Sequence, residues 1–237
     1  MPQTSLFLFI VFACNLIQMI GAFAGTMLAM PFSILLIGAQ EARVVLNAVS
    51  ILSCLYPLFR GCRDICWPEV CKIIALMLVG IAAAQTLLSV YGTNLLLLGY
   101  SLLVLAIALK NLLCKREPRV SGGLGVVLLL AAGLIHGLFI SGGSLLVIYA
   151  LDRFRDKEAF RASLSAVWLV LNGSMIALHG AQGLLTPQRL GLIALALPFA
   201  LLGDAAQRRI DGRRFRLFAN GLLLLSGAVL LFNCLSG

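Results

Sequence analysis

The chain has few charged residues and few groups suited to acid–base chemistry. Asp, Glu, Lys and Arg together make up 11% of its 237 residues, and there are only two histidines. In an ordinary soluble domain, charged residues make up about a quarter of the chain. The cations lie in short segments between apolar runs and form no continuous basic face, which argues against a nucleic-acid-binding protein. The composition therefore excludes both of these classes.

Positive charge is also missing from the N-terminal segment, where the first basic residue is Arg43. A cleaved signal peptide begins with a positively charged region. We therefore interpret the apolar stretch at the start of the chain as a retained membrane segment.

Cysteines are present but form no recognisable framework. There are seven, an odd number, and three of them lie within or beside apolar segments (Cys14, Cys114 and Cys234). Cys62, Cys66 and Cys71 share one short polar segment, but they lack a Cys-x-x-Cys pair and a neighbouring histidine. We predict no disulfide framework, no metal site and no cofactor, and the sequence assigns no role to these three thiols.

Apolar runs dominate the chain, with 61% hydrophobic residues and a mean hydropathy of +1.05. A helix that crosses a bilayer needs roughly 20 apolar residues. Single spans are predicted at residues 44–59, 70–89, 95–113, 162–179, 189–204 and 217–235. The sequence therefore predicts an all-α polytopic membrane protein.

Two further apolar stretches have a length that does not fit a single span. Residues 5–38 are interrupted by Gly21, Gly25 and Pro31, and residues 122–151 by several glycines (Gly133, Gly137, Gly142 and Gly143). Each is too long for one straight span and too short for two. We predict that each enters the membrane, breaks and returns as a shorter helix, for a total of about 8–10 membrane helices.

The distribution of positive charge supports these hairpins. If both stretches fold back, sixteen of the eighteen Lys and Arg residues fall on one side of the membrane, and only Arg43 and Arg189 fall on the other. Lys and Arg accumulate on the cytoplasmic side. This topology predicts that both termini lie on the outer side, with a loop at residues 39–43.

The chain also contains a weak internal repeat at an offset of 118 residues. The matched pairs are Gln18 with His136, Gly25 with Gly143, Thr26 with Ser144, Arg43 with Arg161, Asn47 with Ser165 and Ala48 with Ala166. We predict a first repeat at residues 1–114, a cytoplasmic linker at 115–121 and a second, inverted repeat at 122–237. Inverted repeats with broken helices are typical of secondary transporters, which bind substrate near the membrane midplane.

The glycine-rich segment at residues 132–147 resembles a signature of the TauE/SafE (sulfite exporter) family, and residues 20–31 resemble a degraded copy of it. The segments that begin at Arg43 and Arg161 resemble the family's second signature. The resemblance covers nearly the whole chain. It implies a bacterial inner-membrane transporter of small anions, mostly sulfur-containing oxyanions or organosulfonates, and not an enzyme.

An anion at the midplane needs hydrogen-bond donors, and the predicted spans hold no deep Lys or Arg. Backbone N–H groups at the two breaks are the expected donors, because helix N-termini are positive and glycine permits close approach. Four side chains predicted in the membrane join them. The candidate binding residues are Gly25, Thr26, Ser141, Gly142, Gly143 and Ser144 at the breaks, with Gln18, Asn47, His136 and Ser165 as polar side chains. The alternative is that small residues only pack helices and polar ones only bond between them.

Arg43 and Arg161 sit at matching positions at the starts of two helices. We expect each to attract anions at one mouth of the path. The alternative is that each is an interfacial arginine whose charged end reaches the membrane surface.

All nine carboxylates are predicted in loops or at span ends, which argues against strong coupling to a cation. We therefore expect export, driven by the inside-negative membrane potential. Proton-coupled uptake of an anion or organic acid at the same site stays open. Two other classes also stay open: an intramembrane serine hydrolase that uses Ser141 and His179, and a membrane scaffold without a substrate path. Expected partners are the anion and anionic lipids at the cytoplasmic face, and a homodimer is open.

Overall fold

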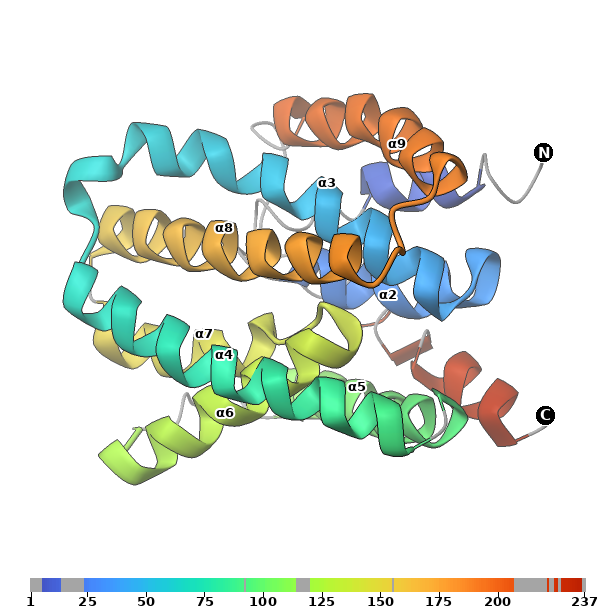
Figure 1. Cartoon of the computed structure of the whole chain (residues 1–237). Coiled ribbons are helices and arrows are strands. Elements are labelled where there is room, and N and C mark those ends of the chain that lie inside the picture. The colour runs from blue at the N-terminus through green and yellow to red at the C-terminus, as the bar shows by residue number, and fades with distance from the viewer. Residues whose placement is uncertain are drawn as a thin grey trace.

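The computed structural model describes residues 6–13, 24–91, 93–113, 120–154, 156–206, 221, 224–225 and 227–235. This part of the chain consists of helices and short connections and contains no strand (Figure 1). Four of its helices are long and apolar enough to cross a bilayer: α3 (Ala39–Arg60), α4 (Trp67–Val90), α6 (Gly122–Phe139) and most of α8 (Lys157–Ala181). The predicted all-α polytopic class is confirmed.

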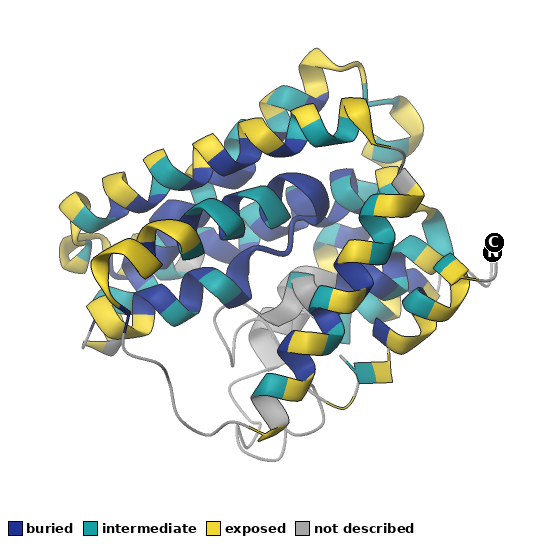
Figure 2. Cartoon of the chain, turned by 90° about the horizontal axis from the view of Figure 1, so that it is seen from below, coloured by how far each residue is buried: buried dark blue, intermediate teal, exposed yellow. Residues whose placement is uncertain are grey.

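Other helical elements complete the described part of the chain. They are α2 (Ala24–Ile37), the 3-10 turn η1 (Cys62–Asp64), α5 (Thr93–Leu113), α7 (Gly143–Arg153) and α9 (Pro187–Ala206). Further helical residues lie at 6–13 and 227–235. Apolar side chains such as Val79, Leu102 and Val127 are exposed on the outer helix faces, where Figure 2 shows exposed residues outside and buried residues between the helices. Such surfaces suit contact with lipid.

The second long apolar stretch forms the predicted hairpin. α6 ends at Phe139, Ile140 adopts a left-handed conformation with φ of 53°, and α7 begins at Gly143. Gly142 lies against Ala132, and Tyr149 lies against Gly125, so α7 runs back along α6. At 1.5 Å per residue, the 18 residues of α6 span about 27 Å and the 11 of α7 about 16 Å, a long arm and a short one.

The break lies at residues 140–142 and not at every glycine of the stretch. Gly133 and Gly137 were expected among the interruptions, but both lie inside α6. A Cβ atom at Gly133 would overlap the carbonyl oxygen of Met77, and one at Gly137 would lie 2.7 Å from the Cβ of Ala84. These glycines allow α6 to approach the backbone of α4, so their role is packing.

The first long stretch is described only in part. Residues 14–23, with Gln18 and Gly21, lie outside the described residues. Pro31 was expected at a break but lies inside α2. α2 ends at Ile37, and Gly38 turns the chain with φ of 89°, a conformation that suits glycine.

The loop predicted at residues 39–43 is wrong, because α3 already begins at Ala39. Glu41 lies in its first turn, where a carboxylate interacts favourably with the positive end of the helix. Arg43 therefore belongs to the second turn of a membrane helix. α8 begins at Lys157, so the first residues of the two helices are separated by the same 118 positions as the sequence repeat. The repeat boundaries and their inversion stay predictions.

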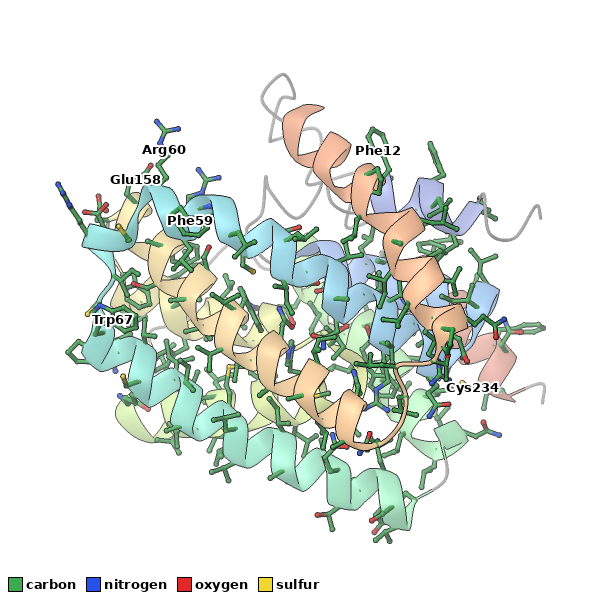
Figure 3. The ribbon with its side chains drawn as sticks, turned by 45° about the horizontal axis from the view of Figure 1, so that its top comes forward. Phe12, Phe59, Arg60, Trp67, Glu158 and Cys234 are labelled. Carbon is green, nitrogen blue, oxygen red and sulfur yellow. The ribbon has the colours of Figure 1, made fainter. Side chains whose placement is uncertain are left out.

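Polar contacts join the helices at both ends of the bundle. At one end the Tyr149 hydroxyl donates to Glu69 Oε2 at 2.8 Å, and the Cys66 N–H donates to Ser163 Oγ at 3.0 Å. Figure 3 shows Phe59, Arg60, Trp67 and Glu158 at this same end. At the other end Arg189 Nη2 pairs with Glu41 Oε1 at 2.9 Å. Both ends of the hairpin lie at the first end, and its tip points into the bundle (Figure 1).

We expect Gly133→Ala to destabilise the protein, because the new methyl group would meet the backbone of α4. Overpacking of this kind costs about 1–3 kcal/mol. A methyl group at Gly123, on the same helix, would have no atom within 4 Å, so Gly123→Ala is the matched control and is expected to be neutral or slightly stabilising. Thermal unfolding in detergent measures both, and equal melting temperatures would contradict the packing role.

Candidate functional site

The tip of the α6–α7 hairpin leaves backbone groups without helical partners. The Gly137 carbonyl accepts a hydrogen bond from Arg43 Nη2 at 3.0 Å and a longer one from Gln85 Nε2 at 3.5 Å. Carbonyls in the last turn of a helix are unpaired and carry partial negative charge, so a guanidinium stabilises this end. Half-buried Arg43, in the second turn of α3, therefore reaches across to the end of α6.

The start of α7 presents the opposite polarity. The Leu146 N–H donates to the Gly142 carbonyl, so the N–H groups of Gly143, Ser144 and Leu145 come before this bond and have no acceptor within α7. No side chain caps this end. The site for a Cβ atom on Gly142 lies 3.0 Å from the Cβ of His136, which places the positive end of α7 directly beside the histidine.

His136 lies in the last turn of α6, just before the break, as predicted. It is 2% exposed, and its ring packs against Trp168 with ring centroids 5.1 Å apart. Neither ring nitrogen has a hydrogen-bond partner. Trp168 and Asn172 are one turn apart on α8 and share a face, and the Asn172 side chain is a neighbour of the imidazole.

Asn47 extends the same polar region from α3. It lies one turn after Arg43, so both side chains project from one face of the helix. Its Nδ2 donates to the backbone carbonyl of Asn172 at 3.2 Å, while its Oδ1 has no partner. Asn47 is fully buried and Asn172 is 2% exposed.

Several buried polar atoms make no hydrogen bond, and some of them belong to residues at or beside the hairpin tip. In the part of the chain that the structure describes they are Ser33 Oγ, Arg43 Nε, Asn47 Oδ1, Asn172 Oδ1 and both ring nitrogens of His136 and His179. Leaving such a group unpaired costs about 1–3 kcal/mol. Most buried polar groups are satisfied, and those that are not call for a ligand, water or functional role. The unpartnered atoms of Arg43, Asn47, His136 and Asn172, with the N-terminus of α7, form the candidate site, which we call the hairpin-tip site.

Comparison with family models identifies the chain. The model described as "Sulfite exporter TauE/SafE" matches residues 6–230. The chain belongs to the TauE/SafE family. It is accordingly a multi-pass membrane protein of a family of sulfite and anion transporters, which are not enzymes. No curated protein and no solved structure matches the chain.

In this TauE/SafE protein Ser141 is held by its neighbours. Its Oγ donates to the Phe139 carbonyl and accepts from the Tyr100 hydroxyl, both at 2.8 Å. The Tyr100 ring stacks on Phe139 with centroids 4.2 Å apart. A serine hydrolase would need a base at the Ser141 hydroxyl, but the Ser141 proton goes to a carbonyl and His179 has no hydrogen-bond partner.

The remaining predicted site residues lie on α8, on α2 or outside the described residues. Ser165 Oγ donates to the Arg161 carbonyl of its own helix, and half-buried Arg161 is the fifth residue of α8, as Arg43 is of α3. Thr26 is half-buried in the first turn of α2. The side-chain environment of Gly25 is not described, and Gln18 lies outside the described residues.

The three clustered cysteines are free and exposed near the start of α4. Among the described residues no group of three or more His, Cys, Asp or Glu side chains is arranged to hold a metal ion.

Four residues of the hairpin-tip site and its support were absent from the predicted site: Gln85, Tyr100, Trp168 and Asn172. Trp168 and Asn172 are four residues apart in a predicted helix, and this spacing indicates a shared face. The sequence carries no comparable sign that Gln85 and Tyr100, from two other helices, meet the hairpin.

We expect Ser141→Ala to destabilise the protein by about 1–3 kcal/mol, because it leaves the buried Tyr100 hydroxyl without its acceptor. Tyr100→Phe removes that hydroxyl, so the double variant should lose less stability than the sum of the single variants. Thermal or denaturant unfolding of all four proteins measures the coupling. Strictly additive losses would show that the hydrogen bond contributes nothing.

Proposed function

We propose that this protein exports a small sulfur-containing anion, such as sulfite or an organosulfonate, which binds at the hairpin-tip site near the membrane midplane. The observation that supports the proposal is a set of buried, unpartnered side-chain donors, Arg43 Nε and the His136 imidazole, beside the uncapped N-terminus of α7, where the N–H groups of Gly143 and Ser144 have no acceptor within the helix. Asn47 borders the same site. In the proposal Gly25, Thr26 and Gln18 of the first hairpin, with Ser165, complete it.

The electrostatics of the site support an anionic substrate. Arg43 contributes a full positive charge, and the α7 N-terminus contributes about half a charge. A charged residue inside the membrane is expensive and commonly marks a substrate path. Arg43 uses one nitrogen to stabilise the end of α6, which leaves its buried Nε available to an anion.

The direction of transport follows from where the acids lie. Glu41 is held by Arg189 at one end of the bundle, and Glu69 by Tyr149 at the other, so neither lies at the hairpin tip. In the proposal no carboxylate at the hairpin tip carries a cation, so the membrane potential itself can drive export, at about 2.3 kcal/mol per charge per 100 mV.

A proton-coupled version of the same transport is the second candidate. Its support is the pair of buried histidines, His136 and His179, neither of which has a hydrogen-bond partner. Histidine is the side chain best suited to carry a proton near neutral pH. Flux that stops when the proton gradient is collapsed at constant membrane potential would favour this version over uncoupled export.

The proposal also assigns an orientation and partners. The end with Arg60, Trp67 and Glu158 faces the cytoplasm of a bacterial inner membrane and contacts anionic lipids, and both termini lie outside. Arg161 lies at the cytoplasmic mouth, while Arg43 serves the substrate from the other half. A homodimer is compatible with this arrangement.

We expect Arg43→Gln to reduce sulfite efflux from proteoliposomes by about 10- to 100-fold, because hydrogen bonds to charged groups contribute about 1.5–3 kcal/mol. Arg43→Lys keeps the charge and should retain partial flux. Arg161→Gln is the matched control at the equivalent position of α8 and should lose no more than a few-fold. Equal losses in the Arg43→Gln and Arg161→Gln variants, with both proteins folded, would remove the support for a site at the hairpin tip.

Orientation is testable with the native thiol of Cys62, which is exposed at the proposed cytoplasmic end. In a chain whose other cysteines are replaced, a membrane-impermeant maleimide should label Cys62 in inside-out vesicles and not in intact spheroplasts. Gln188 is exposed at the opposite end, so Gln188→Cys in a chain lacking the native cysteines should show the reverse pattern. Labelling of Cys62 from outside would contradict the proposed orientation.

A further inference from the structure

The hairpin-tip site contains hydrogen-bond acceptors as well as donors, and the acceptors have no use in binding a bare anion. Asn47 Oδ1 and Asn172 Oδ1 are buried and unpartnered in the described part of the chain. An oxyanion presents only acceptor oxygens, so two carboxamide oxygens facing it would repel it. These acceptors therefore indicate that the ligand carries a hydrogen-bond donor as well as a negative charge.

The orientation of the Asn47 carboxamide is fixed by its surroundings. Its Nδ2 must face the Asn172 backbone carbonyl to donate the 3.2 Å hydrogen bond, because a flipped carboxamide would place two acceptors together. Oδ1 is therefore held as an acceptor by a bond that the fold already makes. Asn172 supplies that carbonyl, and its side chain interacts with the His136 imidazole although its Oδ1 makes no hydrogen bond of regular geometry.

The donors and acceptors belong to one site. Arg43 and Asn47 share a face of α3, and Trp168 and Asn172 share a face of α8. At the end of α6, His136 packs on Trp168 and the adjacent Gly137 carbonyl accepts from Arg43. A Cβ atom on Gly142 would lie beside His136, so the N-terminus of α7 adjoins the same ring. A ligand at this tip thus meets a positive side, from Arg43 and α7, and an acceptor side, from the two asparagines.

The formal charges around the site limit the charge of the ligand. The titratable groups at the site are Arg43 from α3 and His136 from α6, with His179 of α8 within electrostatic range of Arg43, and Glu41, two residues before Arg43, is paired with Arg189. Arg43 and the α7 N-terminus supply about one and a half positive charges, and the negative end of α6, which binds Arg43, offsets about half a charge, which leaves about one. That matches a monoanion, whereas a dianion would remain under-compensated in a medium where unpaired charge is costly.

We propose that the site selects a singly charged oxyanion that also carries a hydrogen-bond donor on its central atom, such as hydrogen sulfite, over the fully deprotonated dianion. The anionic oxygens face Arg43 and the α7 N–H groups, and the O–H group donates to Asn47 Oδ1 or Asn172 Oδ1. This inference rests on the proposed function for the location of the site and adds the protonation state and charge of the ligand.

Three stable ligands separate the requirements at one pH. Sulfamate and methanesulfonate are monoanions of nearly the same shape, but only sulfamate carries N–H donors on sulfur, and sulfate is a dianion without a donor. Binding to the purified full-length protein in detergent is measured as the rise in melting temperature with ligand concentration. We expect sulfamate to stabilise the protein at a concentration at least about tenfold lower than either of the others, because a missing partner leaves a buried acceptor unpaired.

Variants on α8 assign the effect to the acceptors. Asn172→Leu should lose the preference for sulfamate over methanesulfonate while still binding both. Ser174→Ala is the matched control, since Ser174 Oγ donates only to the Leu171 carbonyl of its own helix, and it should keep the preference. If Asn172→Leu does not fold, the comparison of ligands on the wild-type protein decides by itself.

The outcomes distinguish this inference from the proposed transport. Equal binding of sulfamate and methanesulfonate, tighter binding of sulfate, or no binding of any of the three overturns the inference. Sulfite efflux in proteoliposomes is measured separately. Selective binding of sulfamate without sulfite efflux would support the inference about the site and overturn the proposed export, whereas efflux without sulfamate selectivity would do the opposite.

Discussion

A helix that ends inside a packed bundle leaves backbone groups that water cannot satisfy, and the contacts around the end of α6 answer that constraint. α6 ends at Phe139, so the Gly137 carbonyl lacks its usual partner and accepts hydrogen bonds from Arg43 and Gln85 on two other helices. α7 then begins with free N–H groups beside His136. One break therefore creates a negative end that binds the protein's own cation and a positive end that remains available to a ligand.

The break is held in place by close backbone packing. Gly80 and Gly133 let α4 and α6 approach until the backbone of each meets the other, and Gly142 lets the tip of the hairpin rest on α6. Tight packing of small residues is a main source of stability between helices in lipid. The left-handed Ile140 is tolerated because the surrounding contacts fix the turn on both sides. Glycines that allow helices to pack closely and glycines at the hairpin tip thus occur in one segment but have different roles.

Much of this architecture is predictable from residue patterns. Hydrophobic run lengths identify the helices, and the asymmetry of Lys and Arg identifies the folded-back segment, because these depend on the membrane as a solvent and hardly on partners. The sequence-based predictions of helix breaks and helix starts were wrong where contacts with another helix decide them. Gly133 has the same sequence character as Gly142, yet one lies inside a helix and the other at a break, according to what each backbone meets. Arg43 is the last residue of the loop predicted at 39–43, but α3 already begins at Ala39, and Glu41 in its first turn pairs with Arg189.

The sequence by itself determined the membrane class, the broken hairpin at residues 122–151 and the family, since composition, run length and glycine clusters are local properties of the chain. Only the tertiary structure decided which polar groups share a site. Arg43, His136 and Asn172 come from three helices, and hydrogen-bond satisfaction is a property of the assembled bundle: Ser141 finds partners in Tyr100 and Phe139, whereas His136 and the Asn47 oxygen find none. The residue pattern of one helix does not show which hydrogen-bond partners a neighbouring helix provides.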